Sequence, residues 1–211
     1  METTTSYVPE VLREYPIITT MVHADQLMFI LGQLENVLLN NVEGDVVELG
    51  CNCGTTSLFI RRILNHYKSK KCFHVYDSFQ GIPDISPYDI SQTDRQFRKG
   101  QCQTTQEILI QNFCNSRLEP PIIHKGWFSE IPDYEYPEKI AFAFFDGDLY
   151  SSIMDSFSKV YHKLTNNAVI CVHDYKWPVL PGVEKACNDF FADKPGYIKR
   201  APNISVGYVI R

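Results

Sequence analysis

The sequence predicts an α/β fold, in which helices cover both faces of a mostly parallel sheet. Three observations predict it. Short apolar runs alternate with segments of helical periodicity along most of the 211 residues. Strands that are separated by helices are joined by right-handed crossovers, which make neighbouring strands parallel. The apolar runs contain few polar residues, which is typical of strands that are buried on both faces.

The elements follow one another in a regular order. The first helix is indicated by apolar residues at spacings of three and four, among them Leu27, Ile30, Leu31 and Leu34, and the last one carries Pro181 in its first turn. The predicted helices span residues 21–39, 55–67, 103–114, 151–164 and 181–191. The predicted strands span residues 45–49, 72–76, 122–125, 140–145 and 168–172, and residues 197–200 and 205–210 are expected to form a closing hairpin.

The length of the chain fits a single domain. Residues 1–20 are polar and contain two prolines, so we expect a loosely structured N-terminal arm before a domain at residues 21–211. The stretch at residues 78–101 is long for a connection inside a compact domain, and it is predicted to be a lid-like insertion.

Composition narrows the class of protein. Twenty basic against 25 acidic residues leave a net charge of −5, which argues against nucleic acid or an anionic membrane as the main partner. No apolar run approaches the roughly 20 residues of a membrane span, and the first residues lack the features of a signal peptide. The seven cysteines include no C-x-x-C pair, so reduced thiols are expected. These features together predict a cytoplasmic protein.

Ligands of such sheets bind beyond the carboxyl ends of the strands. After the first strand comes Glu48-Leu-Gly50-Cys-Asn-Cys-Gly54-Thr-Thr-Ser57. Gly50 permits a tight turn close to a ligand, and the start of the following helix suits an anionic group. The segment lacks the middle glycine of the nicotinamide fingerprint and the Lys-Ser/Thr of a phosphate-binding loop. It is either a ligand-binding turn of another kind or a plain connection.

Asp77 ends the second strand, about 20 residues beyond this turn. An acidic residue in that place commonly accepts hydrogen bonds from ribose hydroxyls, although a loop carboxylate or a helix cap would look the same. The turn and Asp77 together indicate a ligand that contains a nucleoside but no pyrophosphate.

Polar residues also follow the fourth and fifth strands, as Asp146-Gly-Asp148 and His173-Asp174. Neighbouring ends of parallel strands converge, which would bring Asp146, His173 and Asp174 within reach of one ion. Oxygen ligands favour Mg²⁺, and an imidazole shifts the preference toward Mn²⁺, Fe²⁺ or Zn²⁺. The alternative is that an aspartate caps the next helix and His173 only packs.

Five motifs together resemble a known family. They are Gly44-Asp-Val-Val-Glu-Leu-Gly50 with Gly54, Tyr76-Asp-Ser-Phe-Gln-Gly-Ile-Pro83, Lys125-Gly-Trp-Phe128 with Ile131-Pro132, Phe145-Asp-Gly-Asp-Leu-Tyr150 and His173-Asp-Tyr175. In order and spacing, from about residue 19 to about residue 191, they resemble the S-adenosylmethionine-dependent O-methyltransferases of the macrocin O-methyltransferase (TylF-type) family. This family methylates sugar hydroxyls in antibiotic biosynthesis. The resemblance implies a Rossmann-like class I methyltransferase fold with a seven-stranded sheet and a C-terminal antiparallel hairpin.

The resemblance also implies roles for individual residues. Cofactor binding falls on Met21, Glu48, Gly50, Asn52, Thr55, Thr56, Ser57, Asp77, Ser78, Phe79, Gly126, Trp127, Phe128 and Asp146. A divalent metal, Mg²⁺ or Mn²⁺, falls on Asp146, His173 and Asp174. Asp146 is the first candidate for catalysis and His173 the second, whereas Asp148 is expected to cap the helix that begins near Ser151.

One departure from the family pattern concerns the metal. The family has two aspartates before the tyrosine, and this chain has His173 and Asp174. Weaker Mg²⁺ binding, replacement by Mn²⁺, or a metal-free variant with His173 as general base are therefore all open.

The expected activity is methyl transfer from S-adenosylmethionine to a hydroxyl of a sugar or a glycosylated small molecule, assisted by a metal. The alternatives are a catechol-like phenol O-methyltransferase and a cofactor-binding homologue without transfer activity. A nucleotide-dependent oxidoreductase is disfavoured by the missing glycine. The partner is expected to be a small hydroxyl acceptor, in contact with insertion residues such as Arg95 and Phe97 and with Trp177, and the family often forms homodimers.

Overall fold

The computed structural model describes residues 6–194 and 196–211. Within them, seven strands form one sheet in the order β3-β2-β1-β4-β5-β7-β6. The first five pair in parallel, whereas β7 runs antiparallel to β5 and to β6. The strands are β1 (Asp45–Leu49), β2 (Phe73–Asp77), β3 (Ile122–Lys125), β4 (Ile140–Phe145), β5 (Leu164–His173), β6 (Lys199–Arg200) and β7 (Val206–Ile210). This confirms the predicted Rossmann-like sheet with its C-terminal hairpin.

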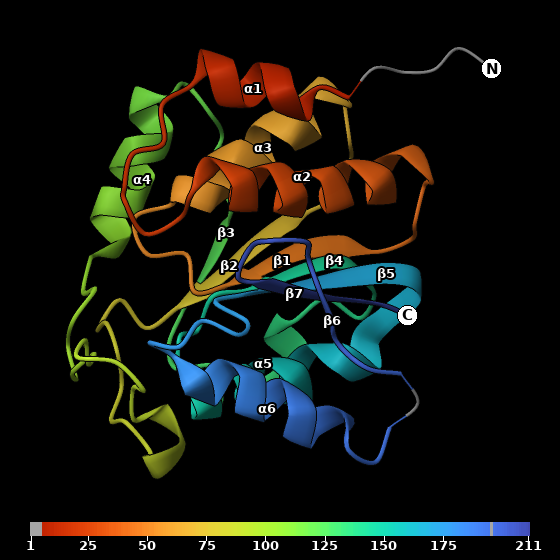
Figure 1. Ribbon diagram of the computed structural model, residues 1–211. Helices are drawn as coiled ribbons and strands as arrows, with labels where there is room; N and C mark the ends of the chain where they lie inside the picture. Colours follow the sequence, from red (N-terminus) through yellow and green to blue (C-terminus); the bar gives the residue numbers. More distant parts are fainter. Residues whose placement is uncertain (1–5, 195) are drawn as a thin grey trace.

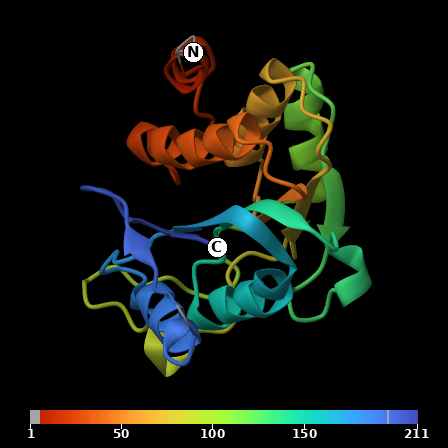
Figure 2. The same ribbon diagram turned by 90° about the vertical axis from the view of Figure 1, so that its right-hand side faces the viewer.

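Helices cover both faces of the sheet (Figures 1 and 2). One layer contains α1 (Val8–Glu14), α2 (Ala24–Leu39), α3 (Thr55–His66) and α4 (Gln106–Asn115), and the other contains α5 (Tyr150–Val160) and α6 (Pro181–Phe191). Short 3₁₀ turns lie at Pro87–Asp89, Asp133–Glu135 and Tyr161–Lys163. None of the helices in the described residues combines the length and the apolar character that crossing a bilayer requires.

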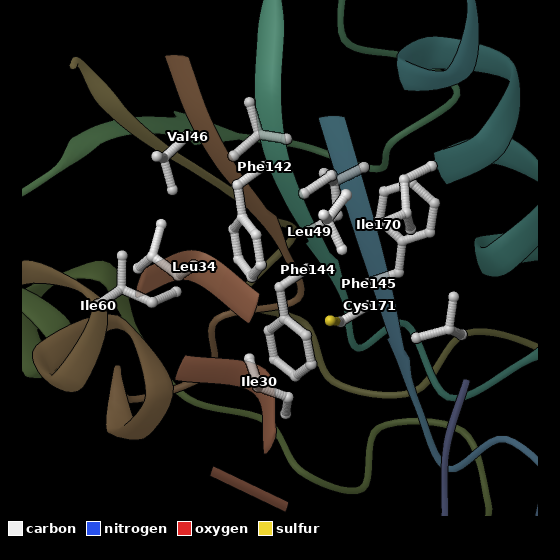
Figure 3. Close-up of a cluster of buried hydrophobic side chains, with 14 of the residues drawn as sticks. Ile30, Leu34, Val46, Leu49, Ile60, Phe142, Phe144, Phe145, Ile170 and Cys171 are labelled. Atoms are coloured by element: carbon white, nitrogen blue, oxygen red, sulfur yellow. The ribbon is translucent and has the colours of Figure 1, made fainter. Parts of the chain in front are cut away.

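The core lies on both sides of β4, the most deeply buried strand (Figure 3). Successive side chains of a strand point to opposite faces. Phe142 and Phe144 therefore point toward the side of α2, where Leu34 and Ile30 lie, whereas Phe145 points the other way and lies 5.1 Å from the ring of Phe157 in α5. All six residues of β4 are buried, which explains why this strand reads as an uninterrupted apolar run.

The N-terminal arm is a correction to the sequence analysis. Residues 1–5 lie outside the described residues, but Val8–Glu14 form α1, whose residues Val8 and Val11 are buried. The prediction of a loosely structured arm is therefore wrong for this stretch. The helix has only seven residues, too few for a clear periodicity, and Pro9 occupies its first turn, where proline is compatible with a helix.

A carboxylate fixes α1 to the domain. The backbone N–H of Tyr7 donates to Oε1 of Glu35 at 2.8 Å, and the hydroxyl of Tyr67 donates to the same oxygen at 2.6 Å. The pKa of Tyr67 is raised to about 12 by burial and by this hydrogen bond. Glu35 of α2 thus links the chain before α1 to the end of α3.

The insertion after β2 is closed at its base and attached to the α5–α6 layer (Figure 1). At the base, the N–H of Ile82 donates to the carbonyl of Gln101, and the N–H of Gly100 donates back to that of Ile82, both at 2.8 Å. Further along, the buried Asp89 accepts from the N–H of Tyr150 at 2.7 Å. The N–H of Gln92 donates to the carbonyl of Pro178.

This contact also corrects the role expected of Asp148. Helix α5 begins after Leu149, which has no side-chain cap, and the first N–H of the helix is bound by Asp89 from the insertion. Asp148 instead lines the cavity described below. The capping group comes from 61 residues earlier in the chain, a distance that local sequence patterns do not cover.

Candidate active site

The carboxyl ends of the strands open into one cavity of about 830 Å³, lined also by the insertion and by the segment before α2. Most of the site residues expected from the sequence lie there. They are Met21, Gly50, Asn52, Asp77, Ser78, Trp127, Phe128, Asp146, His173 and Asp174. The structure thus brings together the predicted donor-binding turn and the predicted metal cluster.

Other expected cofactor residues do not line this cavity. They are Glu48, Thr55, Thr56, Ser57, Phe79 and Gly126. The residues that open α3 are buried beneath the turn, where Ser57 donates to Glu48 at 2.5 Å and Thr55 pairs with Thr19 at 3.0 Å. The contact of all six residues with a cofactor remains a prediction. In this structure the hydroxyls of Ser57 and Thr55 make hydrogen bonds beneath the turn.

Gly50 allows two strand ends to meet. Its φ of +92° is a conformation that favours glycine, and a Cβ at this position would lie 2.1 Å from the carbonyl oxygen of Asp146. The N–H of Asp146 in turn donates to the carbonyl of Leu49 at 2.8 Å. Any larger residue at position 50 would therefore push Asp146 out of place.

The Asp77 carboxylate organises the same turn. Its Oδ2 accepts from the N–H groups of Cys51 and Asn52 at 3.0 and 2.8 Å, and its Oδ1 accepts from Phe79 at 2.7 Å. Burial raises its pKa in spite of these bonds. Asp77 lines the cavity and also fixes the backbone around that position, and its role as a ribose ligand remains a prediction.

Glu48 is a buried acid directly behind the cavity. Its pKa is raised to about 8 by burial and by the charges of Asp146 and Asp77, against the opposing effect of the Ser57 hydrogen bond. The folded protein therefore holds a proton on Glu48 over a pH range in which the unfolded chain has lost it.

This shift predicts a pH-dependent stability. Between pH 4.5 and about 8, the free energy of unfolding should fall as the pH rises, because the folded state binds more protons; the shift corresponds to about 5 kcal/mol. Glu48→Gln should flatten this profile, since the amide is neutral and its oxygen can still accept from Ser57. Urea unfolding at both ends of the range measures the effect. The exposed Glu138→Gln is the control and should follow the unmodified protein; equal slopes in all three proteins would contradict the assignment.

The cluster of Asp146, His173 and Asp174 lies at the ends of β4 and β5. Nδ1 of the buried His173 is 2.8 Å from Oδ1 of Asp146 and 3.2 Å from Oδ2 of Asp174. Carboxylates only accept, so Nδ1 carries a proton. Burial alone would lower the pKa of His173, but the two carboxylates outweigh it and hold the pKa well above its usual range. The imidazole thus holds both aspartates in one geometry.

The cluster fits a divalent ion. One ligand atom from each of the three residues lies within 4.8 Å of the others, and the buried Nε2 of His173 has no hydrogen-bond partner among the described residues. Asp148 adds a further carboxyl, whose pKa is raised well above its usual range by burial and by Asp146 and Asp174. Two carboxylates and an imidazole that has given up its Nδ1 proton are a donor set that suits Mn²⁺ better than Mg²⁺, which prefers oxygen ligands.

Aromatic rings and one arginine border the cavity. The guanidinium of Arg95 lies over the ring of Phe97 at 4.9 Å and over that of Trp177 at 5.4 Å. The two rings meet edge to face at 6.3 Å. Contacts with the acceptor were predicted both for the insertion and for the segment after β5. In the structure these two segments form one wall of the cavity.

Sequence reasoning missed several lining residues. His23 and Gln26 at the start of α2, Cys102 after the insertion and Asp155 in α5 all face the cavity. His23 and Gln26 form a capping box, in which each side chain meets the backbone of the other residue. This pattern marks the true start of α2 at Ala24, three residues after the predicted start at residue 21. Nothing in the local sequence marks Cys102 or Asp155.

Comparisons with known proteins identify the family of the chain. The model of the macrocin-O-methyltransferase (TylF) family matches residues 11–198. Demethyldecarbamoylnovobiocin O-methyltransferase of Streptomyces niveus is 33% identical over 163 residues, which are 74% of this chain and 62% of that protein. Mycinamicin III 3''-O-methyltransferase of Micromonospora griseorubida is 28% identical over 186 residues, 84% of this chain and 72% of that protein. The chain therefore spans less than two thirds of the first relative.

Solved structures of similar fold are also methyltransferases. The O-methyltransferase NovP superposes with a TM-score of 0.79 at 28% identity, covering 95% of this chain and 85% of that one. The calicheamicin methyltransferase CalS11 shares the fold with a TM-score of 0.71 at 17% identity, covering 96% and 89%. The match of the family model to most of the chain, together with the strand-end cavity, shows that the protein belongs to the macrocin-O-methyltransferase (TylF) family.

Proposed function

We propose that the protein is an S-adenosylmethionine-dependent O-methyltransferase that acts on a sugar hydroxyl of a small glycosylated molecule. The observation that carries the proposal is the Asp146–His173–Asp174 cluster, which opens into the same cavity as the Gly50 turn and Asp77. Two relatives are named demethyldecarbamoylnovobiocin O-methyltransferase and mycinamicin III 3''-O-methyltransferase, and these names support the same class of reaction.

The cavity suits a cationic methyl donor next to a hydroxyl. Bound there, S-adenosylmethionine supplies an electrophilic methyl group. Several carboxylates line the cavity, which favours a positively charged ligand. Asp146 lies at the Gly50 turn and is our candidate to accept the proton of the acceptor hydroxyl, a role worth about 10²–10⁴-fold in rate. His173 fixes the orientation of Asp146 through the 2.8 Å hydrogen bond.

We further propose that Asp146, His173 and Asp174 hold a divalent ion, which lowers the pKa of a bound hydroxyl. Removing metal with a chelator should then reduce turnover at least tenfold, and adding Mn²⁺ or Mg²⁺ should restore it. Turnover of chelated, metal-analysed protein with each ion added back is the measurement. Full activity without metal would leave the carboxylates alone as the proton acceptors.

A panel of acceptors tests the function itself. Glycosylated small molecules and matched phenols are incubated with S-adenosylmethionine, and the mass increase of one methyl group is followed in each product. We expect methylation of glycosides. Methylation of phenols alone would favour the catechol-like alternative, and cofactor binding without any product would favour a homologue that has lost transfer.

The remaining expectations extend this proposal. They are a single domain over residues 21–211 with a lid-like insertion at residues 78–101, a cytoplasmic location, no nucleic-acid or membrane partner, and a homodimer. The homodimer follows from the resemblance to the family, and the others follow from the sequence features given above.

A further inference from the structure

The amino ends of β1 and β2 carry a second group of metal-ligating side chains. Asp45 is the first residue of β1, Cys72 directly precedes β2, and His74 is its second residue. Val46 pairs with Phe73 and Val47 with His74, so Asp45 is level with Cys72. Because side chains alternate along a strand, all three lie on the same face of the sheet. One ligand atom from each lies within 4.8 Å of the others.

We propose that Asp45, Cys72 and His74 form a binding site for a divalent ion of the zinc class. The site is separate from the active-site cavity, which none of the three residues lines, and it does not depend on the proposed methyl transfer.

A chain of hydrogen bonds prepares His74 for a metal. Nδ1 of His124 is 2.9 Å from Oε2 of Glu135, and Nε2 of His124 is 3.0 Å from Nδ1 of His74. The carboxylate only accepts, so Nδ1 of His124 donates to it. Nε2 of a neutral His124 then accepts the proton of Nδ1 of His74, which leaves Nε2 of His74 with a free lone pair. A ligating histidine usually donates its other ring N–H to a hydrogen-bond acceptor, and here His124, itself held by Glu135, is that acceptor for His74.

The ring stack keeps this chain in place. His124 stacks on Tyr76 with ring centroids 4.5 Å apart and lies nearly parallel to the ring of His74, at 5.3 Å. The Tyr76 hydroxyl donates to the carbonyl of Glu135 at 3.0 Å. Both ring orientation and tautomer are therefore determined before any ion binds.

The other two ligands are also suitably placed. Oδ1 of Asp45 accepts from the N–H of Cys72 at 2.8 Å, so the carboxylate is oriented and Oδ2 remains available. Cys72 is a free and exposed thiol. Sulfur, imidazole and carboxylate are the ligands that Zn²⁺ takes in proteins, whereas Mg²⁺ prefers oxygen alone. Three protein ligands leave one position of a tetrahedral ion open to solvent or to a further ligand.

Cobalt(II) is the probe that distinguishes this site from the Asp146 cluster, since only a site with a thiolate gives a sulfur-to-cobalt charge-transfer band. The full-length protein is titrated with Co²⁺ at neutral pH in a non-thiol reductant, and Zn²⁺ is then added as competitor. We expect a charge-transfer band that Zn²⁺ abolishes. Cys72→Ser should remove the band, and Cys114→Ser, which replaces another exposed cysteine, should retain it. Absence of the band, or its survival in folded Cys72→Ser, would overturn the proposal.

A second variant tests the supporting chain. His124→Phe keeps a ring stacked on Tyr76 but removes the acceptor for His74. The band should persist, with metal affinity reduced by about 10–100-fold, as is usual when the partner of a ligating histidine is lost. Thermal unfolding of the metal-free variants checks that each is folded. Unchanged affinity in His124→Phe would overturn the assigned role of His124 and Glu135.

Discussion

Replacing Asp146 by asparagine should reduce the turnover number by about 10²–10⁴-fold, the usual contribution of a positioned general base. The amide oxygen can still accept from Nδ1 of His173, so the geometry of the cluster should be preserved. The amide cannot take up the proton of an acceptor hydroxyl, and it is a poor metal ligand. Steady-state kinetics gives the turnover number, and calorimetric titration gives the affinity for S-adenosylmethionine, which should change by less than about threefold, or under 1 kcal/mol.

The split between turnover and cofactor affinity is the decisive readout. Asp193→Asn, at an exposed position that pairs with Lys194, is the matched control and should leave both values unchanged. If Asp146→Asn turns over at the normal rate, Asp146 has no part in the chemistry. If it loses affinity for the cofactor instead, the residue belongs to the donor side of the cavity.

Asp89→Ala should lower the free energy of unfolding by about 2–4 kcal/mol, which combines the loss of a helix cap with that of buried hydrogen bonds. The side chain is 1% exposed and binds the N–H of Tyr150 at 2.7 Å and both the N–H and the hydroxyl of Ser86. Alanine would leave the amide groups unpaired in a buried place. Because the insertion borders the cavity, KM for the acceptor should rise as well. Urea unfolding and acceptor kinetics measure the two effects.

Two further variants separate the effect of the Asp89 hydrogen bonds from the effect of the packing around Asp89. Asp89→Asn keeps an oxygen that can accept from Tyr150, and it should lose less stability than Asp89→Ala. Gly182→Ala disturbs the same contact from α6, because a Cβ at this position would lie 1.9 Å from Oδ1 of Asp89. This variant should also weaken the attachment of the insertion. A fully stable Asp89→Ala with an unchanged KM would show that the insertion is held elsewhere.

The sheet could be predicted from the sequence because its strands are buried on both faces. β4 is entirely apolar, so its limits are clear. β5 begins at Leu164 rather than at residue 168, and its first residues include the half-exposed Thr165 and the exposed Asn166 and Asn167. Where one end of a strand is exposed, hydrophobicity no longer marks it.

The site could be predicted to the extent that it follows strand ends. Asp146, His173 and Asp174 meet because β4 and β5 are parallel neighbours. Contacts between distant segments had no local signal, as with the bond of Asp89 to Tyr150 or the attachment of α1 through Glu35. Such contacts depend on tertiary packing, which periodicity and residue spacing do not describe.

The closed base of the insertion has a consequence for acceptor engineering. The segment leaves and re-enters the domain at adjacent residues, since Ile82 and Gln101 are joined by a backbone hydrogen bond. Its interior is hydrogen-bonded to Tyr150 and Pro178, and it packs against Trp177. A segment with such a closed base, here called the cassette, is a suitable unit for exchange with the corresponding segment of a relative. Exchange of this cassette should transfer acceptor preference while leaving the donor half of the enzyme untouched.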